Sequence, residues 1–249
     1  LYYHKIFTKD FIVKGLKSWK YIRERGKNYQ VQRFAISGDY QKSHFNYKLF
    51  AGFSKDYQLP TLNDLYWNPG GNEELKTEIC RQLNSGFEIS NRLFLIKGEI
   101  FYKKYQDLIT WEPLNSIVWT PKNTSEAVGK GSSLHITVKP FPFFESGIKW
   151  TRQEFNLTPN QSKRLSPVYF PETIFHVYTQ FYHRFAGIVL TGDYTGDVFY
   201  SHDNSLSIPG YWFFSSSMMM KWKFLKMNFS IENLFDEKYQ TIIHYPMPG

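Results

Sequence analysis

Cysteine and long hydrophobic runs are scarce in this chain of 249 residues, and both shortages limit the possible folds. The single cysteine, Cys80, excludes an intramolecular disulfide, and no Cys/His spacing typical of a metal site accompanies it. No run reaches the about 18 apolar residues that a transmembrane helix needs. The first ten residues also lack the charged start, apolar core and cleavage site of a signal peptide.

The net charge of +8 is spread along the chain, and no basic cluster is denser than residues 17–27. Scattered lysines and arginines are typical of a solvated surface, whereas nucleic-acid binding requires a concentrated basic patch. We therefore expect no nucleic-acid partner.

Motifs for catalysis are also missing. The sequence contains no nucleophile motif and no phosphate-binding glycine loop. Asp193, Asp197 and His202 are the most site-like group, and the spacing in Gly192–Asp197 is similar to that of cation-binding loops. Because isolated carboxylates at a strand end are usually solvated, we predict a non-enzyme with no catalytic residue, no metal site and no cofactor.

Aromatic residues are abundant, at 19% of the chain, and they recur in segments where apolar and polar residues alternate. In one such segment Phe45, Leu49 and Phe53 share a face, while Lys48 and Asp56 share the other. Alternation of this kind predicts β-strands, and no helical period competes with it. The first twenty or so residues are poorly patterned, although residues 11–22 could form a strand.

The expected connections alternate between short turns and long loops. Long strands with short turns on one side and long loops on the other are typical of outer-membrane β-barrels. We predict an all-β fold, namely part of an antiparallel up-and-down transmembrane β-barrel. The turns are expected near residues 41–43, 90–92, 140–142, 182–184 and 224–226, and the loops at residues 57–78, 110–128, 156–166 and 202–210.

A soluble β-sandwich or propeller also alternates, because one face of each sheet meets the core. In such folds, short and long connections have no reason to alternate along the chain. The face of each strand that points to solvent should also be charged. Here the apolar faces are rich in Tyr, Trp and Met, as suits contact with lipid and its headgroups.

The longest of these loops, residues 57–78, is too rich in Pro, Gly and Asn to predict a strand or a helix. The amino-acid sequence of this loop resembles a signature of outer-membrane receptors that depend on TonB. The matching residues are Pro60, Leu65, Tyr66, Gly71, Asn72, Leu75 and Glu78.

A second motif near the end of the chain resembles the penultimate strand of the same receptors, and residues 245–249 resemble their last extracellular loop. Residues 129–138 are similar to another strand of the family, but Gly131 is followed by Ser132 and Ser133 where the family has Gly-x-Glu. The residues of the second motif are Asn233, Leu234, Phe235, Asp236 and Tyr239.

This resemblance to TonB-dependent receptors implies a barrel of about 22 strands with a plugged lumen. Residues 1–249 would form one partial barrel domain, with about ten or eleven strands and without the plug, the first half of the barrel or the last strand. The implied location is the outer membrane of a Gram-negative bacterium. The implied partners are outer-membrane lipid, a ligand such as cobalamin or a ferric siderophore, TonB–ExbB–ExbD acting through the plug, and a surface lipoprotein.

The expected function is energised uptake of a scarce ligand that extracellular loops capture. A passive porin-like or adhesive barrel and a soluble all-β carbohydrate binder are the alternatives. Loop aromatics are the candidate ligand contacts, because they give large contact areas at low entropic cost. Trp67, Trp111 and Trp119 could instead belong to the outer aromatic belt. The candidates are Tyr66, Trp67, Asn68, Trp111, Trp119, His202, His244 and Tyr245.

Overall fold

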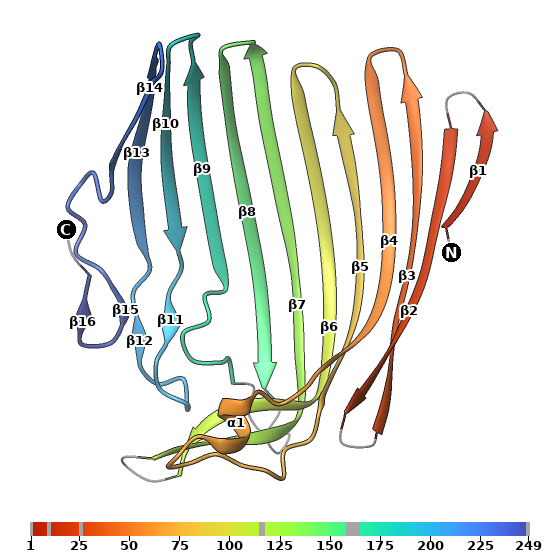
Figure 1. Cartoon of the computed structure of the whole chain (residues 1–249), viewed down its shortest axis with the longest axis vertical. Coiled ribbons are helices and arrows are strands. Elements are labelled where there is room, and N and C mark those ends of the chain that lie inside the picture. The colour runs from red at the N-terminus through yellow and green to blue at the C-terminus, as the bar shows by residue number, and fades with distance from the viewer. Residues whose placement is uncertain (1, 9–10, 25–26, 115–117, 158–164, 248–249) are drawn as a thin grey trace.

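The computed structural model describes residues 2–8, 11–24, 27–114, 118–157 and 165–247. Within these ranges, twelve strands form one antiparallel sheet (Figure 1). In sheet order they are β1 (Tyr2–Thr8), β2 (Phe11–Glu24), β3 (Lys27–Lys42), β4 (Phe45–Gln58), β5 (Glu78–Ser90), β6 (Phe94–Pro113), β7 (Trp119–Phe141), β8 (Phe144–Leu157), β9 (Thr173–Tyr182), β10 (Ala186–Thr195), β13 (Tyr211–Trp222) and β14 (Leu225–Ile231).

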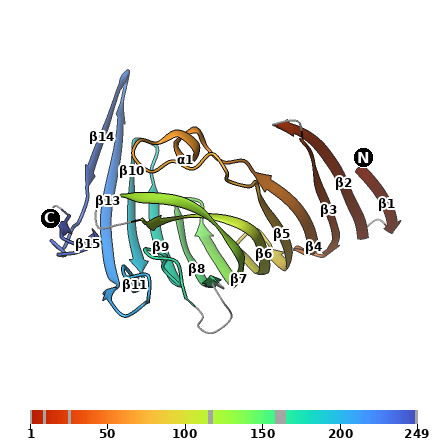
Figure 2. The same cartoon turned by 90° about the horizontal axis from the view of Figure 1, so that it is seen from below.

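Each of these strands pairs antiparallel with the next one along the chain, so the sheet is of the up-and-down type. Seen from the loop end, it curves into an open arc (Figure 2). The prediction of an all-β, antiparallel partial barrel is confirmed. The predicted number of strands is too low, because β1 lies in the segment whose alternation is weak and forms through pairing with β2. No described helix has the length and apolarity needed to cross a membrane.

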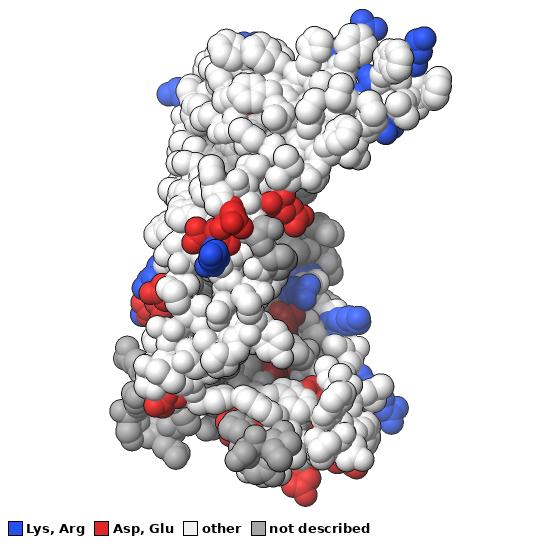
Figure 3. All heavy atoms as spheres, turned by 90° about the vertical axis from the view of Figure 1, so that its left-hand side faces the viewer, with Lys and Arg blue, Asp and Glu red and all other residues white. Residues whose placement is uncertain are grey.

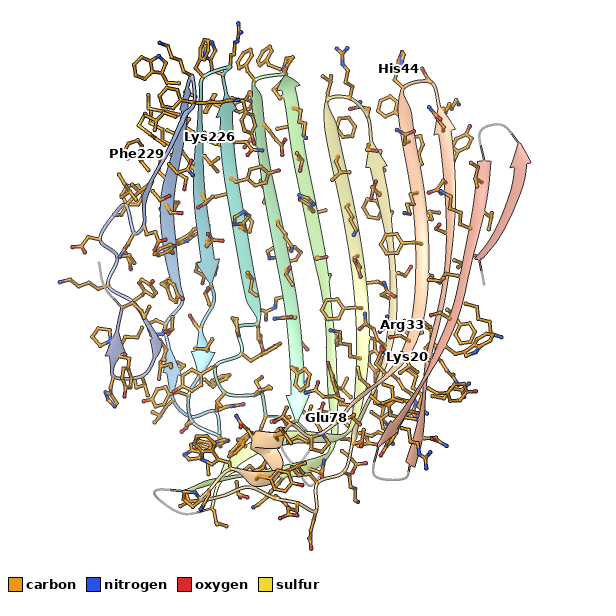
Figure 4. All side chains as sticks on the ribbon, in the orientation of Figure 1. Lys20, Arg33, His44, Glu78, Lys226 and Phe229 are labelled. Atoms are coloured by element: carbon orange, nitrogen blue, oxygen red, sulfur yellow. The ribbon has the colours of Figure 1, made fainter. Side chains whose placement is uncertain are left out.

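The two faces of the sheet differ as the alternation predicts. Phe53, Leu83 and Tyr102 lie directly opposite one another on one face of β4, β5 and β6. Glu78 belongs to the other, polar face of β5, and Figure 4 places it at the loop end beside the segment that carries the single helix. That helix lies on the concave side of the arc (Figure 2), so the polar face is the concave one. Large apolar side chains therefore cover the convex face.

Short connections gather at one end of the sheet, which we call the turn end. His44 and Lys226 mark it in Figure 4. The turns predicted near residues 41–43, 90–92, 140–142, 182–184 and 224–226 all lie there, shifted by one or two residues. The opposite end is the loop end. On the face of β14, Figure 3 shows basic side chains at the turn end and acidic ones gathered across the middle, with mostly uncharged surface between.

The prediction that residues 57–78 contain no helix is wrong, because a helical turn, α1 (Leu62–Tyr66), forms within them. Thr61 caps this turn, and its side chain and that of Asp64 form a reciprocal capping box. Five residues are too few to show a helical period, and a turn this short depends on caps and tertiary contacts.

The predicted loop at residues 110–128 is largely strand. β6 and β7 continue pairing from Gln106 opposite Glu126 as far as Pro113 opposite Trp119. No described neighbour pairs with this extension, which leaves both strands as edges, and edge strands tolerate proline. We call residues 107–114 and 118–126 the long hairpin. Pro121 therefore lies within a strand instead of ending it.

Two other predicted loops contain small elements. Residues 202–210 overlap β12 (Ser207–Ile208), which pairs with β11 (Val198–Phe199). Near the end of the chain, β15 (Gln240–Ile242) pairs with β16 (Tyr245–Pro246) outside the main sheet. Residues 158–164 of the predicted loop 156–166, and residues 248–249 of the last predicted loop, lie outside the described residues.

Candidate functional site

Three connections meet at the loop end: residues 59–77, the long hairpin, and the β11–β12 hairpin. We call them together the loop assembly. Figure 2 shows α1 and the long hairpin on the concave side of the arc, with the hairpin directed toward β10 and β13. The longest connections thus fold over the interior of the arc.

Residues 59–77 form a packed unit with its own small core. Leu65 and Leu75 are buried, and Asp64 joins the unit to the long hairpin. One carboxylate oxygen of Asp64 accepts hydrogen bonds from the main-chain N–H and the hydroxyl of Thr61, at 2.8 and 2.7 Å. The other accepts one from the indole Nε1 of Trp111 at 3.0 Å. The cap of α1 therefore also anchors it to a strand 47 residues away.

The pKa of Asp64 reflects these contacts. Partial burial alone would raise the pKa of this carboxyl, but hydrogen bonds from Thr61 and Trp111 outweigh it and hold the pKa below the ordinary value of 3.8. Asp64 is thus ionised at neutral pH and acts as an acceptor for both neighbours.

Two asparagine side chains fasten residues 59–77 to the long hairpin. Asn72 donates from Nδ2 to the main-chain oxygen of Pro121 at 3.1 Å. Asn123 accepts from the N–H of Lys76 at 2.8 Å and donates from Nδ2 to the oxygens of Lys76 and Asp107, at 3.0 and 2.7 Å. An amide can donate and accept at once, so one asparagine replaces a missing stretch of sheet ladder.

Two glycines allow the chain to pass close to its neighbours. Gly70 has a φ of +123°, and a Cβ there would lie 2.1 Å from the main-chain oxygen of Trp119. A Cβ on Gly71 would lie 2.7 Å from the oxygen of Leu65 and from the nitrogen of Trp67. Only glycine fits at either position, because backbone atoms form both obstacles.

Glu78 completes the attachment where residues 59–77 join β5. Its side chain is buried, and Oε1 accepts a hydrogen bond from the N–H of Ile109 at 2.7 Å. One main-chain N–H on the unpaired edge of the long hairpin thereby gains a hydrogen-bond acceptor. Motif positions 65, 72, 75 and 78 therefore contribute side chains to the packing of the loop assembly, and Gly71 allows the close approach of its backbone.

The long hairpin reaches the β11–β12 hairpin at its free end. The rings of Trp119 and His202 lie 5.4 Å apart, although 83 residues separate them in sequence. The β8–β9 connection joins the same region, where Asn204 accepts from the N–H of Ser166 at 2.7 Å and donates to its carbonyl oxygen at 3.0 Å. The loops are thus tied to one another across the arc.

The structure brings six of the eight candidate ligand contacts to this assembly. Tyr66 and Trp67 are 57% and 55% exposed at the end of α1, and Asn68 follows them. Trp111 donates a hydrogen bond to Asp64, and the ring of Trp119 lies beside that of His202, so both side chains contact neighbouring connections. The sixth is His202, which is exposed beside Trp119.

His244 and Tyr245 lie elsewhere, in the β15–β16 hairpin, and both are exposed. The structure does not bring them together with the other six. Sequence reasoning also missed Asp64 as an organising residue. The spacing of Thr61 and Asp64 is that of a capping box, and this signal could have indicated both residues.

The second family motif forms a tight turn after β14. Asn233, with a φ of 52°, donates from Nδ2 to the oxygen of Glu237 and accepts from its N–H, at 3.0 and 2.9 Å. Phe235 packs edge-on against Phe214, and Tyr239 stacks on Tyr211 at 4.3 Å. The motif therefore fixes the end of β14 against β13.

The concave wall carries an unbroken row of ionisable side chains. Each member lies directly opposite the next across the strands from β3 to β10. Asp193 was expected to be solvated alone, but it contacts Nδ1 of His176 at 2.6 Å and remains half exposed. The row comprises Asp39, Lys48, Glu88, Lys97, His135, Lys149, His176 and Asp193.

Asp197 is engaged as well, because it accepts a hydrogen bond from the N–H of Gly210 at 2.7 Å. Among the described residues, no group of three or more His, Cys, Asp or Glu side chains could hold a metal ion. The arrangement offers polar contacts and exposed aromatic surface for binding.

The chain belongs to the TonB-dependent receptor-like β-barrel family, whose model matches residues 20–234. Among its relatives is the vitamin B12 transporter BtuB of Vibrio vulnificus (strain YJ016). The two are 25% identical over 198 residues, which cover 78% of this chain and 31% of that transporter.

Solved structures share the fold. The copper transporter OprC superposes on 99% of this chain and 45% of its own with a TM-score of 0.74 at 13% identity. A mutant of the ferric enterobactin receptor PfeA of Pseudomonas aeruginosa, in complex with enterobactin, gives a TM-score of 0.71 at 16% identity, over 94% of this chain and 39% of the receptor. The chain thus spans less than half the length of each of these proteins.

Proposed function

We propose that this chain supplies wall and ligand-capturing loops to a receptor in the outer membrane of a Gram-negative bacterium, which takes up a scarce ligand with energy from TonB. Cobalamin or a ferric siderophore is the ligand class we favour. The support is a family relative named as a vitamin B12 transporter and a similar fold in a receptor for ferric enterobactin.

The observation that carries this proposal is the loop assembly itself. A barrel that only passes solutes needs an open mouth, whereas these connections fold over the concave side and are fixed there. Side-chain hydrogen bonds hold one connection against another, and they involve Asn72, Asn123 and Glu78. Such preorganisation lowers the entropic cost of binding a ligand.

The exposed surface of the assembly suits a large ligand with apolar and polar parts. Tyr66 and Trp67 present aromatic area that is more than half exposed, and Asn68 adds an amide beside them. Below them, the row of ionisable side chains gives the concave wall a polar lining. A polar wall beneath an aromatic capture surface is consistent with passage of a ligand through the interior.

In this proposal the complete receptor contains a plug that contacts TonB–ExbB–ExbD in the periplasm. A surface lipoprotein that covers the loop end is a further proposed partner. Energised release from the loops would then depend on segments outside this chain.

The test replaces the exposed aromatics and leaves the scaffold in place. Tyr66→Ala with Trp67→Ala is introduced into the receptor in cells, and binding of radiolabelled cyanocobalamin and ferric enterobactin is measured. We expect one of the two ligands to bind, and its affinity to fall at least about tenfold, because each lost aromatic contact is worth about 1 kcal/mol or more.

Leu62→Ala provides the matched control, since Leu62 is 75% exposed on the same helical turn. It should leave the affinity within about twofold. Equal affinities in the double variant and the parent would refute capture by this surface. Uptake that continues after the TonB system is deleted would instead favour a passive barrel.

A further inference from the structure

The convex face carries one cation on each of five successive strands, immediately beyond its apolar side chains. On β4 and β5 these are Lys55, after Phe53, and Arg81, after Leu83 in the direction of the loop end. The remaining three lie at similar positions on β6, β7 and β8, although on β7 the side chain before the cation is Ser132. They are Lys104, Lys130 and Arg152.

The pairing register shows that these cations form a continuous line. Lys55 lies opposite Arg81, and Arg81 lies opposite Lys104. Lys130 lies opposite Tyr102, one inward step of two residues from Lys104, and Arg152 lies opposite Ser132, one further step. Strands of a barrel tilt and stagger, so a line that follows the membrane plane must step in register in this way.

The height of the line matches one surface of a membrane. We count residues along a strand from the first convex-face side chain at the turn end to the cation. The separation is ten residues on β4, from Phe45 to Lys55, and eight on β8, from Phe144 to Arg152. At about 3.3 Å per residue and about 40° tilt, this distance corresponds to about 20–25 Å along the membrane normal. The apolar band of an outer-membrane barrel is about 25 Å tall, so the cations lie at its loop-end edge.

Carboxylates neutralise only part of this line. Glu126 pairs with Lys104 at 3.0 Å, and the other two cations toward β9 are paired in the same way by Glu154 and Glu172. Among the ion pairs of the described residues, none involves Lys55 or Arg81. The ammonium group of Lys55 lies 5.1 Å from the centre of the Tyr57 ring, and Arg81 donates to the amide oxygen of Gln106.

An apolar groove of about 920 Å³ lies directly on the membrane side of Lys55 and Arg81. Phe53 and Leu83 form its rim next to these cations, and the small side chains of Ala51 and Ser85, opposite each other in the next row, belong to its lining. Ile100, Tyr102 and Phe34 contribute further apolar surface. The groove is open and crosses the strands from β2 to β6 alongside the charged line, and Lys17 of β2 also belongs to its lining.

We propose that Lys55 and Arg81 bind the phosphate of a lipid headgroup in the outer leaflet, with an acyl chain of the same lipid in the groove below. This inference rests on the outer-membrane location in the proposed function. Arginine binds phosphate oxygens in a bidentate fashion, and lysine adds a mobile positive charge. Two cations that form no ion pair with a carboxylate of the described residues, next to an apolar groove, match the charge and the apolar tail of such a lipid.

The purified protein in detergent provides the test, with diphosphoryl lipid A as the probe and native mass spectrometry as the readout. The parent protein should retain the lipid, and Lys55→Gln with Arg81→Gln should lower its affinity at least about tenfold, because two charge-assisted contacts are lost. Lys48→Gln is the matched control. Lys48 is exposed on the concave face of the same strand, and its replacement should change the affinity less than about twofold.

A second variant tests the groove independently of charge. Ala51→Phe fills the groove from an exposed position, and it should weaken lipid A binding while the melting temperature stays within a few degrees of the parent. Equal lipid retention by the parent and the double variant would overturn the proposal. So would equal binding of dephosphorylated lipid, or full displacement of lipid A by equimolar pyrophosphate, which would indicate a site for free phosphate.

These measurements need no transported ligand. Loss of lipid binding with intact ligand capture would therefore separate this site from the loop assembly, and failure of ligand capture would leave the lipid result standing.

Discussion

At the turn end of the sheet, β5 and β6 are joined by residues 91–93, and the side chain of Asn91 accepts hydrogen bonds from the N–H groups of Leu93 and Phe94, at 2.7 and 2.9 Å. At the loop end, residues 59–77 are held by Trp111 and Asn123, which lie 47 residues from their partners. The same strands therefore have one end closed by local contacts and another closed by distant ones. Only the second kind of closure creates a surface from several connections, which is where we place ligand capture.

The largest expected effect comes from a bulky side chain at Gly71. In Gly71→Val, backbone atoms of Leu65 and Trp67 obstruct the new Cβ at 2.7 Å, so residues 59–77 must detach from the long hairpin. We expect a loss of about 3 kcal/mol or more in local stability, read as rapid proteolysis within residues 59–77. Gly187→Ala at the turn end is the control, because no atom lies closer than 3.5 Å to its Cβ. Equal protease resistance in both variants would contradict the described packing.

The next effect compares two asparagines directly. Asn123→Ala removes three hydrogen bonds between distant connections and should destabilise the loop assembly by about 1–3 kcal/mol. Asn91→Ala removes two local bonds at the turn end and should leave hydrogen exchange in residues 59–77 unchanged. If Asn91→Ala exposed the loop end as much as Asn123→Ala does, the two ends would not be independent.

A pH dependence of the loop end follows from Asp64. Its pKa in the folded protein is below 3.8, so the unfolded segment binds a proton more readily. The stabilisation is fully present above about pH 4 and is lost as the pH falls through the folded pKa. The protection of residues 61–67 against hydrogen exchange, relative to the intrinsic exchange rate at each pH, should therefore decrease as the pH falls below about 4, and Asp64→Asn should lack this step. A step that persists in Asp64→Asn would assign it to another carboxyl group.

The smallest effect concerns the contact between the long hairpin and the β11–β12 hairpin. A double-mutant cycle of Trp119→Ala and His202→Ala should give a coupling energy of about 0.5–1 kcal/mol, since the ring contact is partly exposed. A coupling near zero would mean that the two hairpins lie side by side without stabilising each other.

The wall of this protein could be predicted well, and the loop assembly only in part. Alternation at Phe45, Leu49 and Phe53 has a period of two, which local sequence displays directly. The sequence did not predict the long hairpin as strand, because a proline such as Pro121 normally indicates the end of a strand. Its tolerance depends on an unpaired edge, and no local pattern reveals which edges stay unpaired.

The sequence by itself determined most strands of the sheet, their facing and the short turns, because backbone sterics, alternation and turn residues act within a few residues of one another. It also displayed the family motifs, although it did not show that Gly71 and Glu78 serve packing. Only the tertiary structure decided that α1 forms and that Trp119 meets His202. Only pairing in register brought Lys55 next to Arg81 above an apolar groove. Contacts of these kinds join residues far apart in the chain, and their free energy exists only once the strands between them have paired.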